Sequence, residues 1–403
     1  MTSTTIRPPH GAAENPDRRP GLSARVVLGR VFAPVPSEFL LILSTALLLT
    51  GFGLVMVLSA TSAVGSANGD KPYEALIKQA VFAALGIPMM LIASRFSIAF
   101  WKKIAWPALI AATAFQMLVF TPLGINNAGN TNWIRIAGLQ AQPSEFLKLT
   151  LALWLGYVLF RKRTLLGLWR HVFIPVVPVS IAVIATVMAG HDLGTAMILV
   201  LIVLAALFFS GVKLRLFILP LVVGVAGVGV LAVTSSNRLN RILTLFDPVC
   251  ADYDNACYQP LHGIWGLASG GIFGLGLGNS KQKYDWLPAA ANDYIFAIVG
   301  EELGLIGCIV VLLLFALFAV GAFHIVRKTN DPFVRIVSGA VTLWIVGEAL
   351  LNIGVVLRVF PVLGVPLPFM SQGGTSLLST LLACGVLLSF ARSLPAKKPA
   401  VTG

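Results

Sequence analysis

Charged residues are scarce in this sequence: Asp, Glu, Lys and Arg make up 11% of its 403 residues, whereas 57% are hydrophobic. An ordinary soluble domain carries roughly 25% charge, and a water-facing globule of this size needs more polar surface than this chain supplies. The mean hydropathy of +0.88 points the same way. The composition therefore excludes an ordinary soluble enzyme. It predicts an integral membrane protein whose spans are helical, because lipid offers backbone groups no other partner.

Ten stretches are apolar over roughly the length that a bilayer crossing requires, about 20 residues. They are residues 38–59, 75–94, 104–122, 144–160, 172–190, 193–211, 215–234, 294–325, 334–357 and 375–391. We therefore expect an all-α polytopic membrane protein with ten transmembrane helices. Residues 1–37 read as a disordered cytoplasmic tail, 38–392 as the membrane domain and 393–403 as a second cytoplasmic tail.

Positive charge alternates between the two sides of this predicted bundle. Loops on the side of the N-terminus carry 20 Lys and Arg residues, the opposite loops carry 8, and Lys148 alone falls inside a span. Cytoplasmic loops are the ones enriched in Lys and Arg, so both termini are expected in the cytoplasm. The net charge of +13 is then a topology signal, and no nucleic-acid partner is expected. No short apolar core with a small-residue cleavage site precedes residue 39, so a cleaved signal peptide is not expected and the first span should serve as the anchor.

Cysteine is also rare, with four residues. Cys308 and Cys384 fall in apolar spans, where a buried inert thiol is the expected state. Cys250 and Cys257 fall on the outer side, in oxidising surroundings, and form a disulfide candidate. Two free thiols are the alternative.

One outer loop is long, residues 235–292 between the seventh and eighth spans, and long loops in compact proteins are often functional. Its glycine-rich run, residues 270–278, is a weak match to a phosphate loop and is better interpreted as a tight turn or a half-inserted segment. Lys281 and Lys283 follow it. Asp293 stands where the eighth span begins, either as a cap of that helix or as a reactive carboxylate at the water–lipid boundary.

Ionisable residues inside the spans are costly and are functional candidates. Glu145 and Lys148 are three residues apart on the fourth span, so they share a face and can pair with each other or line a substrate channel. Glu301 and Glu302 lie in the eighth span. Further polar candidates on the outer half are His191-Asp192, Glu348 with Asn352, Arg358, and Ser371 to Ser376, where Thr375 or Ser376 could cap the tenth helix.

Taken in order, these residues resemble the SEDS family (shape, elongation, division and sporulation) over about residues 38–392. The matching motifs are Trp133-Ile134, Gln142-Pro-Ser-Glu145 with Lys148, Asp192-Leu-Gly-Thr195, Asp247-Pro248, Tyr258-Gln259, Ala268-Ser-Gly-Gly271, Leu275-Gly-Leu-Gly-Asn-Ser280 with Gln282-Lys283, Leu287-Pro288, Asp293-Tyr-Ile-Phe-Ala297, Glu301-Glu-Leu-Gly304, and Pro366-Leu-Pro368 through Gly373-Gly-Thr-Ser376. The last of these is closest to the actinobacterial cell-division branch. The chain departs from the family pattern at Ala289–Asn292, which lacks the usual flanking acid and His, at Thr131 and Asn132 before Trp133, and at Gln372.

The resemblance implies a peptidoglycan glycosyltransferase that polymerises lipid II at the outer face of the plasma membrane during division. It also implies a class B penicillin-binding protein as partner, with other divisome membrane proteins, and a location at the septum. The family's outer-loop aspartate falls on Asp293, which we expect to act as general base in an inverting displacement. Substrate-binding candidates are Lys283, Lys281, Glu145, Lys148, Trp133, Arg358, Ser371 and Thr375. No cofactor and no dedicated metal cage are evident, and a role for a divalent cation (Mg²⁺ or Mn²⁺) stays open.

Three alternatives remain at this stage. A lipid II flippase could use the intramembrane residues Glu145, Lys148, Glu301 and Glu348 to line a transport route. The elongation-type polymerase of the same family would share the chemistry. A scaffold that recruits division proteins would tolerate substitution of Asp293 and Lys283.

Overall fold

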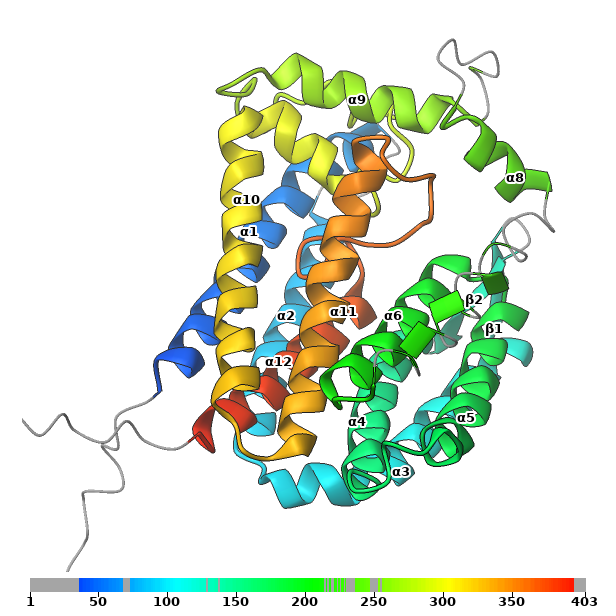
Figure 1. Ribbon diagram of the computed structural model, residues 1–403. Helices are drawn as coiled ribbons and strands as arrows, with labels where there is room; N and C mark the ends of the chain where they lie inside the picture. The colour runs from blue at the N-terminus through cyan, green and yellow to red at the C-terminus, as the bar shows by residue number, and fades with distance from the viewer. Residues whose placement is uncertain are drawn as a thin grey trace, which may run out of the picture. The chain divides into compact units, whose positions relative to one another are not determined.

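The computed structural model describes residues 36–67, 73–127, 130–136, 138–213, 236–246, 253 and 256–394, with scattered residues between 215 and 229 (Figure 1). The elements are α1 (Ser37–Ala67), α2 (Glu74–Ala93), α3 (Ile98–Met117), the 3₁₀ turn η2 (Leu118–Phe120), β1 (Gly124–Asn127), β2 (Asn130–Ile136), β3 (Leu139–Ala141), α4 (Ser144–Arg161), α5 (Trp169–Ala189), α6 (Leu193–Phe209), α8 (Ser236–Leu243), α9 (Tyr258–Gly270), α10 (Ile295–Lys328), α11 (Pro332–Val356) and α12 (Gly374–Arg392).

The expected polytopic helical architecture is confirmed, although the count of ten spans is not. Among the residues that the structure describes, seven helices are long and apolar enough to cross a membrane: α1, α2, α3 with η2, α5, α10, α11 and α12. The apolar helix α6 has 17 residues, and α4 has 18 residues that include Glu145, Lys148 and Arg161. The predicted span 215–234 and the predicted tails 1–37 and 393–403 lie largely outside the described residues.

A small antiparallel sheet, which the sequence did not predict, joins α3 to α4. The strand order is β1-β2-β3, with Trp133 opposite Ile125 and Ile134 opposite both Gly124 and Ala141. These strands have three to seven residues, too few for a hydrophobic alternation to stand out in the sequence. The sheet lies on the side of the bundle that carries α8 and α9 (Figure 1).

The helices pack so that α11 lies in the interior. It contacts α4 and α6 on one side and α10 on another, while α1 packs against α10, α2 against α12 and α3 against α4. Most of α11 and α12 is buried, whereas only 22% of the apolar window of α2 and 24% of that of α5 is buried. An exposed apolar helix face is what contact with lipid requires.

The chain begins and ends its membrane domain at the same face. The Arg392 guanidinium at the end of α12 lies 4.5 Å from the ring centroid of Phe39 at the start of α1. At this face Lys328 pairs with Glu38, and Lys102 lies 2.7 Å from Asp331. Loops that the sequence assigned to one side therefore meet on one side, as alternation requires. Which face is cytoplasmic stays a prediction, and the opposite face is called the outer face here after that prediction.

Helix α10 is broken near its outer end. Gly304 has φ 66° and ψ −162°, and the two parts of the helix meet there at an angle (Figure 1). The sequence predicted one apolar span over residues 294–325, and the break divides this span into a short part before Gly304 and a longer part after it. Only glycine adopts this φ and ψ readily.

Candidate functional site

Asp293 precedes α10 at the outer face, where the loop after α9 meets the segment between α11 and α12. The N-cap residue of α10 is Tyr294, and no side-chain hydrogen bond caps the helix, so the capping role considered for Asp293 is not found. The side chain is partly buried. A carbon placed as Cβ on Gly364 would lie 3.7 Å from Asp293 Oδ2. The carboxylate therefore faces the 357–373 segment.

The backbone that carries Asp293 is held from two other elements. Asn352 Nδ2, on α11, donates to Asp293 O and to Val365 O, each at 2.7 Å. Ser371 Oγ donates to Asn292 O at 2.7 Å and accepts from Leu367 N at 2.7 Å. Because each of these side chains bonds both the aspartate loop and the 357–373 segment, the position of Asp293 relative to that segment is fixed by short polar contacts.

The surroundings of Asp293 raise the pKa of its carboxyl group toward neutral pH. The pKa of Asp293 is raised to about 6, first by burial and then by the negative charge of Asp192, while the positive charge of Arg241 opposes the shift. Burial also raises the pKa of the neighbouring Tyr294 phenol, so this group stays protonated. A base with a pKa near 6 is mostly ionised at pH 7 and still has appreciable proton affinity.

Asp192 is the second acid of this region, and its carboxylate is fully engaged. It caps α6 by accepting from Thr195 N at 2.9 Å and from Thr195 Oγ1 at 2.8 Å. Gln142 Nε2 and Asn132 Nδ2 donate to its Oδ2 at 3.0 and 3.3 Å. These four donors satisfy the carboxylate of Asp192. Asp192 therefore ties β2 and the start of α4 to α6.

Trp133 and Thr375, two predicted substrate-binding residues, lie close to this network. Trp133 is on β2, next to Asn132, and is partly buried. Thr375 Oγ1 accepts from Gln142 N at 3.1 Å, and the N-cap of α12 is Gly373 without a side-chain cap bond. The helix-start cap considered for Thr375 is therefore not found, and its hydroxyl instead joins α12 to the start of α4.

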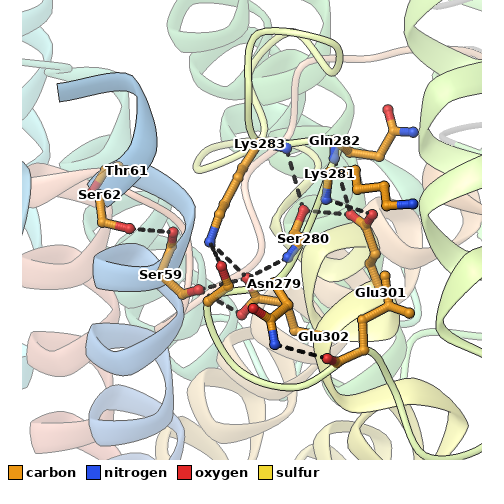
Figure 2. Close-up of polar contacts among 12 residues, drawn as sticks. Ser59, Thr61, Ser62, Asn279, Ser280, Lys281, Gln282, Lys283, Glu301 and Glu302 are labelled. Carbon is orange, nitrogen blue, oxygen red and sulfur yellow. Dashed lines mark hydrogen bonds and ion pairs between the residues drawn. The ribbon is translucent and has the colours of Figure 1, made fainter. Parts of the chain in front are cut away.

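Lys283 is buried and paired, as Figure 2 shows. Its Nζ donates to Gly278 O at 2.6 Å and lies 3.3 Å from Glu302 Oε1. Ser59 Oγ, from α1, donates to both carboxylate oxygens of Glu302 at 2.6 Å. Binding an anion through Lys283 would require its ammonium to leave these acceptors. The neighbouring Lys281 side chain is exposed.

Glu301 holds the backbone of the same loop. Its carboxylate accepts from the Ser280 hydroxyl, from Lys281 N at 2.8 Å and from Gln282 N at 3.4 Å (Figure 2). Glu301 and Glu302 are thus both satisfied by the loop 278–283. The partners of these two acids are thus this loop and Ser59 of α1.

Lys148 sits at the centre of a buried charge cluster between three helices. Its Nζ lies 2.9 Å from Glu145 Oε2, as expected from their spacing, and 2.8 Å from Glu348 Oε1 on α11. Trp344 Nε1 donates to Glu348 Oε2 at 2.5 Å, and Ser379 Oγ of α12 donates to Glu145 Oε2 at 3.2 Å. The cluster joins α4, α11 and α12.

Two further predicted residues lie on the outer loops. Arg358, just after α11, adopts φ 57° and donates from Nη2 to Thr244 O at 3.0 Å, at the end of α8. The backbone of a bulky residue in this left-handed region is strained, and such strain is commonest at functional sites. Cys257 is buried and disulfide-bonded, whereas its predicted partner Cys250 lies outside the described residues.

The site predicted from the sequence did not include three residues: Asp192, Asn352 and Arg241. Asp192 and Asn352 were noted as polar, yet nothing in a single sequence says that they approach Asp293 across 59 to 101 residues of chain. Arg241 carried no local signal at all. Within the part of the chain that the structure describes, no group of three or more His, Cys, Asp or Glu side chains is arranged to hold a metal ion.

The fold and the site together define a multi-pass membrane protein with an acidic centre at one face. A family model described as cell cycle protein (FtsW/RodA/SpoVE) matches residues 39–395. The chain belongs to this family, as the sequence motifs indicated.

Named relatives support the assignment. The chain is 37% identical over 386 residues to a protein of Mycobacterium tuberculosis named probable peptidoglycan glycosyltransferase FtsW, covering 95% of this chain and 72% of the relative. It is 32% identical over 358 residues to stage V sporulation protein E of Bacillus subtilis, covering 88% and 97%.

Solved structures share the fold. A chain of a peptidoglycan synthase complex, described as coordinating polymerization and crosslinking, matches with a TM-score of 0.69 and 23% identity, over 87% of this chain and 96% of that one. The rod shape determining protein RodA of Thermus thermophilus matches with a TM-score of 0.66 and 22% identity, over 91% of this chain and 100% of that one.

Proposed function

We propose that this protein is a peptidoglycan glycosyltransferase that polymerises lipid II into glycan strands at the outer face of the plasma membrane. Relatives named for this activity support the reaction class. The observation that carries the proposal is Asp293, a partly buried carboxylate that caps no helix and has a pKa raised to about 6. A structural carboxylate is normally paired or hydrogen-bonded, as Asp192 is, whereas a general base needs an accessible lone pair.

In this mechanism the Asp293 carboxylate accepts the proton of the acceptor sugar 4-hydroxyl. The freed oxygen attacks the anomeric carbon of the donor, the bond from that carbon to the lipid pyrophosphate breaks, and the pyrophosphate leaves with the electron pair. A single displacement inverts the anomeric carbon. General base catalysis of this kind contributes roughly 10²–10⁴-fold to the rate.

The departing pyrophosphate requires nearby positive charge. Lys281 is exposed and Arg358 is partly buried at the same face, so these two remain the best placed of the predicted cations. Lys283 and Lys148 are engaged with carboxylates, and we propose that they hold the architecture around the substrate rather than meet its phosphates. Trp133, Ser371 and Thr375 belong to the elements around Asp293. We propose that the acceptor sugar binds among them.

A class B penicillin-binding protein is the proposed partner, with other divisome membrane proteins around it. A structural neighbour that belongs to a synthase complex coordinating polymerization and crosslinking supports a transpeptidase partner. Relatives named FtsW favour action in cell division at the septum over the elongation role. The Lys and Arg distribution favours cytoplasmic termini.

The decisive experiment is polymerisation of lipid II by the purified protein, with and without its penicillin-binding partner, using the parent and Asp293→Asn. The parent is expected to make glycan and the variant to lose roughly 10²–10⁴-fold in rate. Asp285→Asn, an exposed acid of the same loop, is the matched control and should retain the parent rate. Unimpaired synthesis by Asp293→Asn would refute the assignment of the base, and a parent without any polymerase activity would refute the function.

The flippase alternative gains no support from the geometry. Lys148, Glu145 and Glu348 pair with one another in a buried cluster, and Glu301 is satisfied by loop amides. A transport route needs polar groups that are available to cargo across the bilayer. Lipid translocation lost in Asp293→Asn, with polymerisation intact, would reverse this preference.

A further inference from the structure

The segment from Gly271 to Gly278, here called the glycine hairpin, is the part of the outer loop that the proposed reaction leaves without a role. It presents Ile272, Phe273 and Leu277 with 59%, 81% and 56% of their surface exposed. Exposed side chains of this size are unfavourable in water. Their placement at the break in α10 indicates what covers them.

The hairpin satisfies its own backbone on the break in α10. Leu275 N donates to Glu301 O at 3.0 Å, and Gly276 N donates to Glu302 O at 2.9 Å. In an unbroken helix these two carbonyls would accept from the amides one turn further along. The break at Gly304 turns those amides away. The hairpin therefore fills the acceptor positions that the break opens.

The exchange is reciprocal. Leu305 N and Ile306 N, the first two amides after the break, donate to Gly271 O at 2.9 Å and Ile272 O at 3.3 Å. Non-helical backbone is tolerated at membrane depth only where its polar groups are bonded within the protein. The hairpin meets this condition at the two amides and two carbonyls that it exchanges with α10.

The exposed apolar side chains of the hairpin continue into the lipid-facing side of α10. Beyond the break, Leu305, Ile306, Ile309 and Leu313 are exposed by about half of their surface, on a helix whose length and hydropathy are those of a membrane span. Since Leu305 and Ile306 are hydrogen-bonded to the hairpin, the two apolar surfaces adjoin.

We propose that the glycine hairpin inserts into the outer leaflet of the bilayer, with Phe273 and its apolar neighbours among the lipid acyl chains. The outer end of α10 and the hairpin then form one lipid-facing surface. Insertion removes Phe273, which is 81% exposed, from water, and it anchors the segment that carries Lys281, Lys283 and Asp293 to the membrane surface.

Site-directed spin labelling of the full chain in nanodiscs tests this proposal. A nitroxide is attached to Phe273→Cys, in a background with Cys308→Ala and Cys384→Ala, and its collision rates with oxygen and with a water-soluble nickel chelate are compared. Leu313→Cys on α10 is the lipid-facing control, and Asp285→Cys, on an exposed acid of the same loop, is the water-facing control. Each variant is first checked for an unchanged unfolding temperature.

The label at 273 is expected to match the label at 313, with oxygen access several-fold above that of the chelate and the reverse ratio at 285. Chelate access equal to that at 285 would overturn the proposal. Exclusion of both reagents from 273 would overturn it as well, because the hairpin would then be covered by protein. None of these outcomes depends on enzymatic activity, so the proposed function is tested separately.

Discussion

At Asp293, the protein keeps a carboxylate at a position where ionisation is unfavourable. Its pKa of about 6 lies above the ordinary value of 3.8 because of burial and the Asp192 charge. The folded protein therefore binds this proton more tightly than the unfolded chain does, and the resulting contribution to stability is lost as pH rises through about 6. Above that pH, Asp293→Asn should be as stable as the parent or more so, which separates its catalytic loss from misfolding.

The same shift predicts a pH profile. kcat/KM for lipid II should rise with pH through an acid limb near 6, because only ionised Asp293 accepts a proton. Asp192→Asn removes a neighbouring negative charge while its amide oxygen can still cap α6, so the limb should move to lower pH. Initial rates between pH 4.5 and 8 test both points. A limb unchanged in Asp192→Asn would contradict electrostatic coupling between the two acids.

Asn352 should act as a positioning residue for Asp293, since its amide donates to both Asp293 O and Val365 O. Asn352→Leu is expected to lower kcat by at least roughly tenfold with little change in KM, because small misplacements of a catalytic group are costly. Thr342→Val is the matched control: Thr342 is buried on the same helix but bonds only Ser338 O. Equal losses in both variants would point to general destabilisation of α11.

Among the elements, the broken helix α10 and the glycine hairpin restrict most strongly which residues their positions can accept. A Cβ on Gly304 would lie 2.4 Å from Gly274 N and from Ile272 O, and its φ of 66° is strained for any other residue. Gly304→Ala should therefore destabilise the protein by about 1–3 kcal/mol for the backbone strain, and further for the clash. Thermal unfolding in detergent measures the effect. Gly51→Ala in α1, where nothing lies within 4 Å, should be neutral or mildly stabilising.

Helical elements were predictable because their signal is long and local. Runs of about 20 apolar residues mark the spans, and most helix bounds fall within a few residues of the expected ones. The three strands were missed because they are short, and the break in α10 was missed because Gly304 alone does not distinguish a helix interior from a bend. Its partner, the hairpin, lies about 30 residues earlier in the chain.

For the whole molecule, the Lys148 cluster joins three helices that are distant in sequence. Lys148→Met would leave Glu145 and Glu348 buried without their cation, and breaking such a pair costs about 3–5 kcal/mol. A lower unfolding temperature in detergent is the expected result, with partial recovery in Lys148→Met combined with Glu348→Gln. A variant that unfolds like the parent but has lost polymerase activity would instead show that Lys148 meets substrate.

The candidate site was only partly accessible to sequence reasoning for the same reason of distance. Asp293, Glu145 and Lys148 belong to dense local motifs and could be named. Asp293 contacts Asn352 and Gly364, and the charges of Asp192 and Arg241 act on its pKa. These interactions depend on how α6, α8 and α11 pack, which no local pattern encodes. The burial of Lys283 was likewise unpredictable, since its partner Glu302 belongs to another element.

The two acids at the outer face come from different groups of helices. Asp192 begins α6, which packs with α4 and α5, whereas Asp293 precedes α10, which packs with α1, and α11 contacts both groups. Repulsion between two charges falls with their separation. A hinge movement that parted the groups would therefore lower the proton affinity of Asp293, and one that closed them would raise it. The packing of α11 against both groups of helices therefore helps to set the proton affinity of the proposed base.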